Sequence, residues 1–75
     1  MMHLDRIRAL REDHDLTQTE LSKKLKVSQR AYSFYETGQR QLPLDILCDL
    51  ADIYKTSTDY LLGRTDEKKI NKNNQ

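Results

Sequence analysis

A short stretch from residue 29 to residue 34 carries side chains that can recognise the edges of nucleic-acid bases. Glutamine can pair with adenine through two hydrogen bonds and arginine with guanine, so Gln29 and Arg30 are candidates for reading bases. Ser33 can donate or accept a hydrogen bond. Phe34 could pack on thymine methyl groups, or it could instead contact a dimer partner or solvent. The alternative for Gln29 and Arg30 is an ordinary polar exposed face.

A second set of polar residues could contact a phosphate backbone. Gln18 begins a predicted helix, where free backbone amides and the positive end of the helix dipole favour a phosphate. Contacts to phosphates position a protein without specifying a sequence. We expect this role at Gln18 and, at the end of the second helix and after it, at Thr37, Gln39, Arg40 and Gln41. Thr17 and Ser28, which precede the two helices, are further candidates for contacts with DNA.

Two short helices with a tight turn between them must position these side chains. Residues 17–20 (Thr-Gln-Thr-Glu) form a capping box, which predicts that a helix starts at Gln18. Ser28 can cap a second helix, and Gly38 can end it in a left-handed conformation. Helices of about eight residues with about three residues between them must cross steeply, as in a helix-turn-helix unit. Apolar residues in the turn and at helical spacing supply a shared core: Leu21, Leu25, Val27, Tyr32 and Tyr35.

The remaining sequence predicts three more helices, over residues 4–13, 44–54 and 58–62. Pro43 suits the start of one, Ser57 can cap the last, and Gly63 can end it. Cys48 is expected at the edge of a buried stripe. The expected fold is therefore all-α, with five helices in one domain over residues 1–64 and a polar, disordered tail over residues 65–75. Its other core residues are expected to be Leu4, Ile7, Leu10, Leu47, Leu50, Ala51 and Tyr54.

The net charge of +1 is small, but the charges are unevenly distributed. Residues 22–41 contain five basic side chains and one acidic side chain, whereas residues 42–62 contain one basic and four acidic. A nearly neutral protein can therefore present one basic face to phosphates. The alternative is an ordinary solvated face.

Several classes of function find no support in the sequence. Cys48 is the only cysteine, and neither His3 nor His14 has further metal ligands at a suitable spacing, so we expect no disulfide and no metal. Glycine-rich phosphate loops and nucleophile motifs are absent, so we expect no enzyme and no cofactor. No stretch approaches the roughly 20 apolar residues that cross a bilayer. Residues 1–11 are too charged for a signal peptide, which predicts a cytoplasmic protein.

The run from Ile7 to Thr65 resembles the lambda-repressor-like (XRE-type, or Cro/C1-type) helix-turn-helix family. Two positions differ from the usual pattern of the family, which has alanine where this chain has Ser22 and glycine where it has Lys26. A lysine with positive φ at this turn would cost on the order of 1 kcal/mol and would add a charge near a phosphate backbone. The matching residues are Leu16, Thr17, Gln18, Leu21, Leu25, Val27, Ser28, Gln29, Tyr35, Glu36, Thr37, Gly38, Leu47, Leu50, Ala51, Asp59, Tyr60, Leu61 and Leu62.

The resemblance implies a lambda-repressor-like DNA-binding domain whose helix-turn-helix lies in its second and third helices. It implies a transcriptional regulator that binds specific sequences of double-stranded DNA, such as a phage or mobile-element repressor. It also implies that the Gln18 amide contacts a phosphate of the DNA backbone. The chain has no room for a separate ligand-sensing domain, so we expect no small-molecule ligand and a homodimer on a two-fold symmetric operator. The alternative is a protein-interaction module such as an antitoxin or an adaptor.

Two further contacts are expected. Tyr60, Leu61 and Leu62 are consecutive large apolar residues on a short helix, and one helix face cannot bury all three in its own domain. We therefore expect a weak homodimer interface at these residues, with Tyr60 left for a partner. The resemblance also implies a partly buried ion pair between Arg11 and Glu36.

Overall fold

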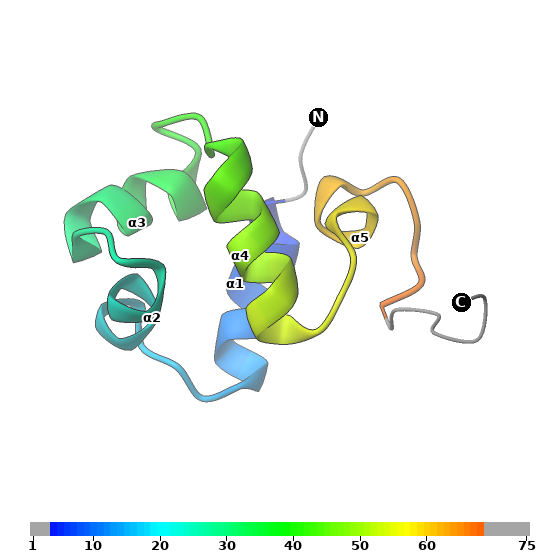
Figure 1. Cartoon of the computed structure of the whole chain (residues 1–75), viewed down its shortest axis with the longest axis horizontal. Helices are drawn as coiled ribbons and strands as arrows, with labels where there is room; N and C mark the ends of the chain where they lie inside the picture. The colour runs from blue at the N-terminus through cyan, green and yellow to red at the C-terminus, as the bar shows by residue number, and fades with distance from the viewer. Residues whose placement is uncertain (1–3, 69–75) are drawn as a thin grey trace.

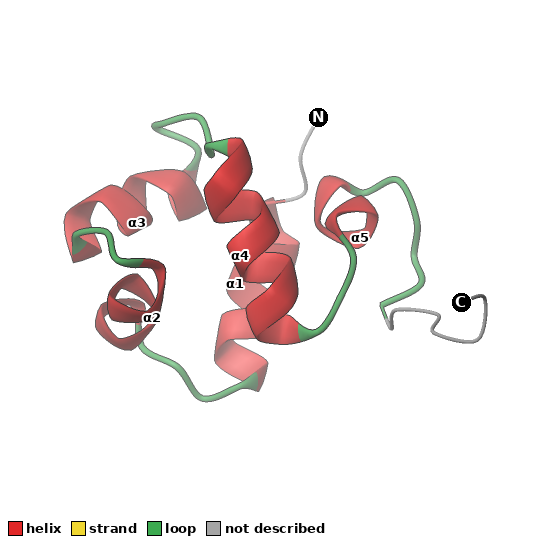
Figure 2. Ribbon diagram, viewed as in Figure 1, coloured by secondary structure: helices red, strands yellow, loops and turns green. Residues whose placement is uncertain are grey.

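Five α-helices joined by short loops form the domain in the computed structural model, which describes residues 4–68 (Figure 1). They are α1 (Leu4–Asp13), α2 (Gln18–Leu25), α3 (Gln29–Thr37), α4 (Leu44–Tyr54) and α5 (Thr58–Leu62). In the view of Figure 1, α2 and α3 lie on one side of α4 and α5 lies on the other. No strand occurs in the described part of the chain (Figure 2), so the prediction of an all-α, five-helix domain is confirmed.

Three helices begin where the sequence predicts side-chain caps. In the capping box, Thr17 Oγ1 accepts from the Glu20 amide at 3.0 Å, and Glu20 Oε1 accepts from the Thr17 amide at 2.9 Å. The hydrogen bond from the Thr17 amide to the Glu20 carboxylate is the largest cause that lowers the pKa of Glu20. The hydroxyls of Ser28 and Ser57 cap α3 and α5 by accepting backbone amides, each at 3.0 Å. A cap of this kind stabilises a helix by about 1 kcal/mol.

Two helices end at a lysine in the left-handed region. Lys26 has φ 61° after α2, and Lys55 has φ 54° after α4. The strained conformation of Lys26 was expected, whereas that of Lys55 was not, because no glycine pattern marks this end. Each conformation costs on the order of 1–2 kcal/mol. The amides that follow offset part of this cost, since Val27 N donates to Ser22 O at 3.0 Å and Thr56 N donates to Ala51 O at 2.9 Å.

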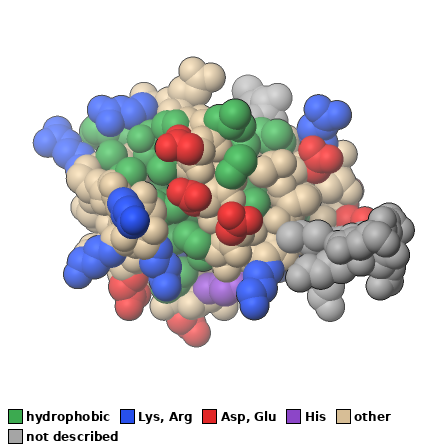
Figure 3. Space-filling model, viewed as in Figure 1, with side chains coloured by type: hydrophobic (Ala, Val, Ile, Leu, Met, Phe, Trp, Pro, Cys, Tyr) green, Lys and Arg blue, Asp and Glu red, His purple; other side chains and the backbone are tan. Residues whose placement is uncertain are grey.

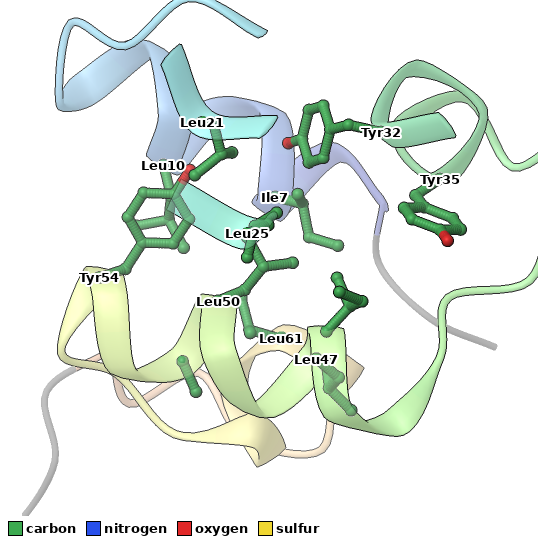
Figure 4. Close-up of a cluster of buried hydrophobic side chains, with 12 residues drawn as sticks. Ile7, Leu10, Leu21, Leu25, Tyr32, Tyr35, Leu47, Leu50, Tyr54 and Leu61 are labelled. Carbon is green, nitrogen blue, oxygen red and sulfur yellow. The ribbon is translucent and has the colours of Figure 1, made fainter. Parts of the chain in front are cut away.

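Buried side chains from all five helices point toward one another and form a single core (Figure 4). The buried face of α4 is wider than the sequence pattern indicated, because Ile46 is buried as well. Cys48 is exposed and therefore lies outside the buried stripe, which corrects that expectation. His3 and the side chain of Leu4 lie outside the described part of the structure. The core consists of Ile7, Leu10, Leu21, Leu25, Tyr32, Tyr35, Ile46, Leu47, Leu50, Ala51, Tyr54 and Leu61.

The segment after α5 is attached to α1 through Arg6. Arg6 Nη1 donates to the backbone oxygens of Tyr60 and Thr65, each at 2.7 Å, and Nη2 lies 2.7 Å from Asp66 Oδ1. Lys68 Nζ lies 3.6 Å from Asp13 Oδ2, and its backbone oxygen accepts from the Thr56 hydroxyl. This part of the predicted disordered tail is therefore held in place, by Arg6 and Asp13 of α1 and by Thr56 in the loop before α5. Residues 69–75 lie outside the described part.

Candidate nucleic-acid interface

The α2–turn–α3 unit packs one face on the core and leaves the other exposed. Residues 26–28 connect the two helices. Leu21, Leu25 and Tyr32 are buried, and Val27 is half-buried in the turn, as the pattern predicted. Thr17 and Ser28 cap the two helix starts, and both residues are exposed, so the N-terminal ends of both helices are open to solvent.

The candidate residues gather on the exposed side of this unit. Gln29 and Arg30 are exposed at the first turn of α3, whereas Ser33 and Phe34 are half-buried one turn further along. Gln18 is half-buried at the first turn of α2. The remaining candidates are exposed and lie at the helix starts, at the end of α3 or in the loop after it: Thr17, Ser28, Thr37, Gln39, Arg40 and Gln41.

Gln18 and Gln29 join the starts of α2 and α3 directly. Gln29 Nε2 donates to Gln18 Oε1 at 2.8 Å, and Gln18 Nε2 donates to Glu36 Oε1 at 3.1 Å. The Glu36 carboxylate can only accept hydrogen bonds, so the NH₂ group of Gln18 must face it. The oxygen of Gln18 then faces Gln29, and the NH₂ group of Gln29 must turn toward that oxygen. The charge on Glu36 therefore fixes the orientation of both amides.

This arrangement leaves Gln29 with one N–H and its carbonyl oxygen free. A glutamine has two N–H donors and a carbonyl acceptor, and only one donor is used by Gln18. One donor and one acceptor are what adenine requires for a bidentate pair in the major groove. The side chain is therefore preset for that pairing, which sequence reasoning did not detect because residues 18, 29 and 36 are far apart in the chain.

Glu36 is the buried centre of this network. It forms an ion pair with Arg11, with Nε 3.0 Å from Oε2, and accepts a hydrogen bond of 2.6 Å from the Tyr32 hydroxyl. Burial alone would raise the pKa of Glu36, but hydrogen bonds from Arg11, Tyr32 and Gln18 outweigh it and hold the pKa below its ordinary value. The hydrogen bond to Glu36 raises the pKa of Arg11. Both groups therefore remain charged at neutral pH, and the expected ion pair is present.

The caps leave hydroxyl protons available. Thr17 Oγ1 and Ser28 Oγ each accept a backbone amide, so the proton of each exposed hydroxyl can still be donated, for example to a phosphate. Thr37 differs, because its hydroxyl donates to Ser33 O at 3.0 Å within α3. Thr37 is thus less available as a donor than the sequence implied.

Basic side chains surround the α2–α3 side of the molecule. Figure 3 shows Lys and Arg side chains concentrated there, whereas acidic side chains face the viewer over α4. The exposed basic residues of this part of the chain are Lys23, Lys24, Lys26, Arg30 and Arg40. The charges are therefore separated in space as well as along the sequence, and the positive charge lies beside the candidate base readers.

The residues expected at a dimer interface have different exposures. Leu61 is 0% exposed, because it packs inside its own domain, and it therefore cannot contact a partner. This corrects the expectation for Leu61. Tyr60 and Leu62 are half-buried, and the Arg6 guanidinium carbon lies over the Tyr60 ring, 4.3 Å from its centroid. Of these three residues, Tyr60 and Leu62 retain exposed surface for a partner.

Residues 4–68 contain no cluster of three His, Cys, Asp or Glu side chains that could hold a metal ion. Within the same residues, no helix has the length and apolarity needed to span a membrane.

Three relatives from Bacillus subtilis (strain 168) are similar to most of this chain. "Uncharacterized HTH-type transcriptional regulator YobD" is 41% identical over 66 residues, which cover 88% of this chain and 59% of that protein. "HTH-type transcriptional regulator AnsR" is 36% identical over 67 residues, covering 89% of this chain and 58% of that protein. "HTH-type transcriptional regulator ImmR" is 36% identical over 66 residues, which cover 88% of this chain and 52% of that protein. The chain thus spans less than two thirds of each relative's length.

A family-level match agrees with these relatives and with the geometry. Residues 7–61, which run from α1 into α5, match the family described as Helix-turn-helix. The match includes the complete α2–turn–α3 unit and both members of the Arg11–Glu36 pair. The chain belongs to the lambda-repressor-like (XRE-type) helix-turn-helix family of DNA-binding transcriptional regulators.

Proposed function

We propose that this protein binds a specific double-stranded DNA operator in the cytoplasm as a homodimer and represses transcription from it. The α3 helix, hereafter the recognition helix, enters the major groove with its N-terminal end toward the bases. A domain bound over a promoter blocks polymerase without needing further contacts, which favours repression. The family resemblance favours a regulator of the phage or mobile-element type.

The observation that carries this proposal is the fixed orientation of the Gln29 amide. Gln18 and Glu36 determine which end of Gln29 is free, and the free atoms suit an adenine. An ordinary polar face does not need its glutamines held in this way. Gln29 is thus the proposed reader of an adenine.

Neighbouring side chains complete the proposed interface. Arg30 is exposed one residue further along α3 and suits a guanine, and Ser33 can contact either kind of base. Phosphate contacts come from the surrounding exposed residues at the helix starts and after α3: Thr17, Gln18, Ser28, Gln39 and Arg40.

The proposed homodimer uses the remaining apolar surface of α5. Tyr60 and Leu62 are half-buried on this five-residue helix, so a partner would cover apolar surface that the domain leaves open. So small an interface predicts monomers and dimers in exchange at micromolar concentrations. Sedimentation of the full chain, alone and with DNA, tests this. A strict monomer at millimolar concentration and on the selected duplex would exclude the dimer.

Selection from a random duplex library tests the proposed function. The full chain is used to select duplexes, and competition titrations then compare a selected duplex with random duplexes of equal length at several salt concentrations. A specific regulator should bind the selected site at least about 10³-fold more tightly and should lose affinity steeply with salt. Equal affinity for both, with little dependence on salt, would favour a protein-interaction module. A reporter with the selected site inside its promoter tests repression.

A further inference from the structure

Phe34 lies beneath two guanidinium groups on the exposed side of the recognition helix. The Arg30 guanidinium carbon lies over its ring at 5.7 Å from the centroid, and the Arg40 guanidinium carbon lies over it at 5.3 Å. Both distances fall within the range in which an aromatic ring attracts a cation. Phe34 is only half-buried, so its ring is available for these contacts.

Two separate features of the backbone bring these groups together. Arg30 precedes Phe34 by four residues on α3, which places both side chains on the same face of the helix. Arg40 lies in the loop after α3, and its backbone amide donates to Phe34 O at 3.2 Å. The loop therefore folds back against the end of the helix and brings the Arg40 side chain to the ring.

Neither arginine has a competing partner in the described part of the chain. No carboxylate of residues 4–68 lies within ion-pair distance of Arg30 or Arg40, and both side chains are exposed. Two like charges near one ring repel each other. The negative face of the ring offsets part of this repulsion, and a planar guanidinium can also stack on it.

We propose that Phe34 is a positioning residue that preorganises Arg30 and Arg40 for DNA, rather than a residue that contacts bases itself. This inference rests on the proposed function. Arg30 is the proposed guanine reader and Arg40 a proposed phosphate contact, so one ring couples a specific contact to a nonspecific one. Long arginine side chains lose rotamer freedom when they bind, and a side chain that is already ordered loses less.

A double-mutant cycle on the full chain tests this coupling. The variants are Phe34→Leu, Arg40→Ala and the pair together. Phe34→Tyr is the matched control, because it keeps the aromatic ring. Affinity is measured for a duplex selected with the wild-type chain and for a random duplex of equal length. Thermal melts establish that each variant is folded.

Phe34→Leu should weaken binding by about 2- to 5-fold for each arginine, the fold-change that corresponds to an exposed cation–π contact. Arg40→Ala should then cost about 2- to 5-fold less in the Phe34→Leu background than in the wild type. Phe34→Tyr should bind like the wild type. Purely additive effects of Phe34→Leu and Arg40→Ala would overturn the inference. So would a loss confined to duplexes with thymine at one position, because that pattern means that Phe34 packs on a thymine methyl.

A second measurement does not depend on any variant or on DNA. Protons of a side chain stacked on an aromatic ring shift upfield in NMR spectra, so the δ-methylene and Nε protons of Arg30 and Arg40 should be shifted in the wild-type chain. Unshifted protons on both arginines would overturn the inference even if the Leu variant did not fold. If the wild type binds selected and random duplexes equally, the proposed function fails. If the wild type prefers the selected duplex and Phe34→Leu binds both duplexes with the same affinities as the wild type, only the present inference fails.

Discussion

Arg11 and Glu36 form a two-point ion pair between α1 and the last turn of α3. Arg11 Nε lies 3.0 Å from Glu36 Oε2, and Nη2 lies 3.1 Å from Oε1. Their side chains are only 13% and 5% exposed. Arg11 Nη1 also donates to Leu16 O at 2.9 Å, in the segment that leads into α2. One guanidinium group therefore fixes α3 relative to α1 and to the start of the helix-turn-helix.

Replacing Glu36 with alanine should lower the free energy of unfolding by about 3–5 kcal/mol. The substitution leaves the Arg11 charge, the Tyr32 hydroxyl and the Gln18 amide without their acceptor. Urea unfolding monitored by circular dichroism measures the change. The matched control is Glu12→Ala, whose exposed pair with Arg8 at 3.2 Å should contribute about 0–1 kcal/mol. A Glu36→Ala loss of only a few tenths of a kcal/mol would mean that the pair is not stabilising.

The same carboxylate should make stability depend on pH. Because the pKa of Glu36 in the folded chain lies below its ordinary value of 4.5, the charged form favours folding. This contribution is complete above pH 4.5 and is lost as the pH falls through the folded-state pKa. Glu36→Gln cannot titrate, so its free energy of unfolding should fall less with acidification than that of the wild type. Unfolding curves at a series of pH values measure both slopes, and equal slopes would contradict the prediction.

Two buried tyrosines allow a matched comparison of hydroxyl groups. The Tyr32 hydroxyl donates to Glu36, whereas the Tyr54 hydroxyl is buried without a hydrogen-bond partner among residues 4–68. Burial raises the pKa of both tyrosines, so each hydroxyl stays protonated at neutral pH. Tyr54→Phe should therefore leave stability unchanged or raise it, while Tyr32→Phe should lower it by about 1–3 kcal/mol. Thermal and urea unfolding measure the stability of the two variants. A larger loss of stability in Tyr54→Phe than in Tyr32→Phe would contradict the prediction.

Arg6 should contribute more to stability than the neighbouring Arg8. Arg6 is 16% exposed and donates to two backbone oxygens, whereas Arg8 is 66% exposed and pairs only with Glu12. Hydrogen bonds from a charged donor contribute about 1.5–3 kcal/mol, so Arg6→Ala should lower the free energy of unfolding by about that amount. Arg8→Ala removes only the exposed pair with Glu12 and should lower it by about 0–1 kcal/mol. Hydrogen exchange should also become faster at residues 60–66 in Arg6→Ala alone, and equal exchange in both variants would contradict this role.

Local patterns predicted the helices well, because each boundary depends on residues close in the chain. The capping box at residues 17–20 and the glycines at positions 38 and 63 act within one helical turn. Contacts between distant residues left no such pattern. Arg6 reaches a segment about 60 residues away, and nothing in its neighbours indicates this. The surface of α5 depends on the packing of the whole domain, so the burial of Leu61 could not be read from three consecutive apolar residues.

The helical positions of the candidate residues were predictable from the sequence, but their hydrogen bonds were not. Gln29 and Arg30 followed from helical periodicity and from the chemistry of their side chains. The contact between Gln18 and Gln29 depends on how α2 and α3 cross, and Phe34 meets Arg40 only because the following loop folds back. These relationships come from tertiary structure, and they determine which atoms are free to bind.

The fixed amide of Gln18 predicts two effects of Gln18→Ala on DNA binding. Loss of a proposed phosphate contact should weaken binding to all duplexes about equally. Loss of the hydrogen bond that orients Gln29 should also relax the preference for adenine at one base position. Arg30→Ala is the comparison variant, and it should cost about 1–3 kcal/mol at a different position, the proposed guanine. Competition titrations against single-base variants of a selected duplex, at fixed salt, separate these effects. Unchanged base preference in Gln18→Ala at every position would show that Gln29 does not need Gln18 to orient it.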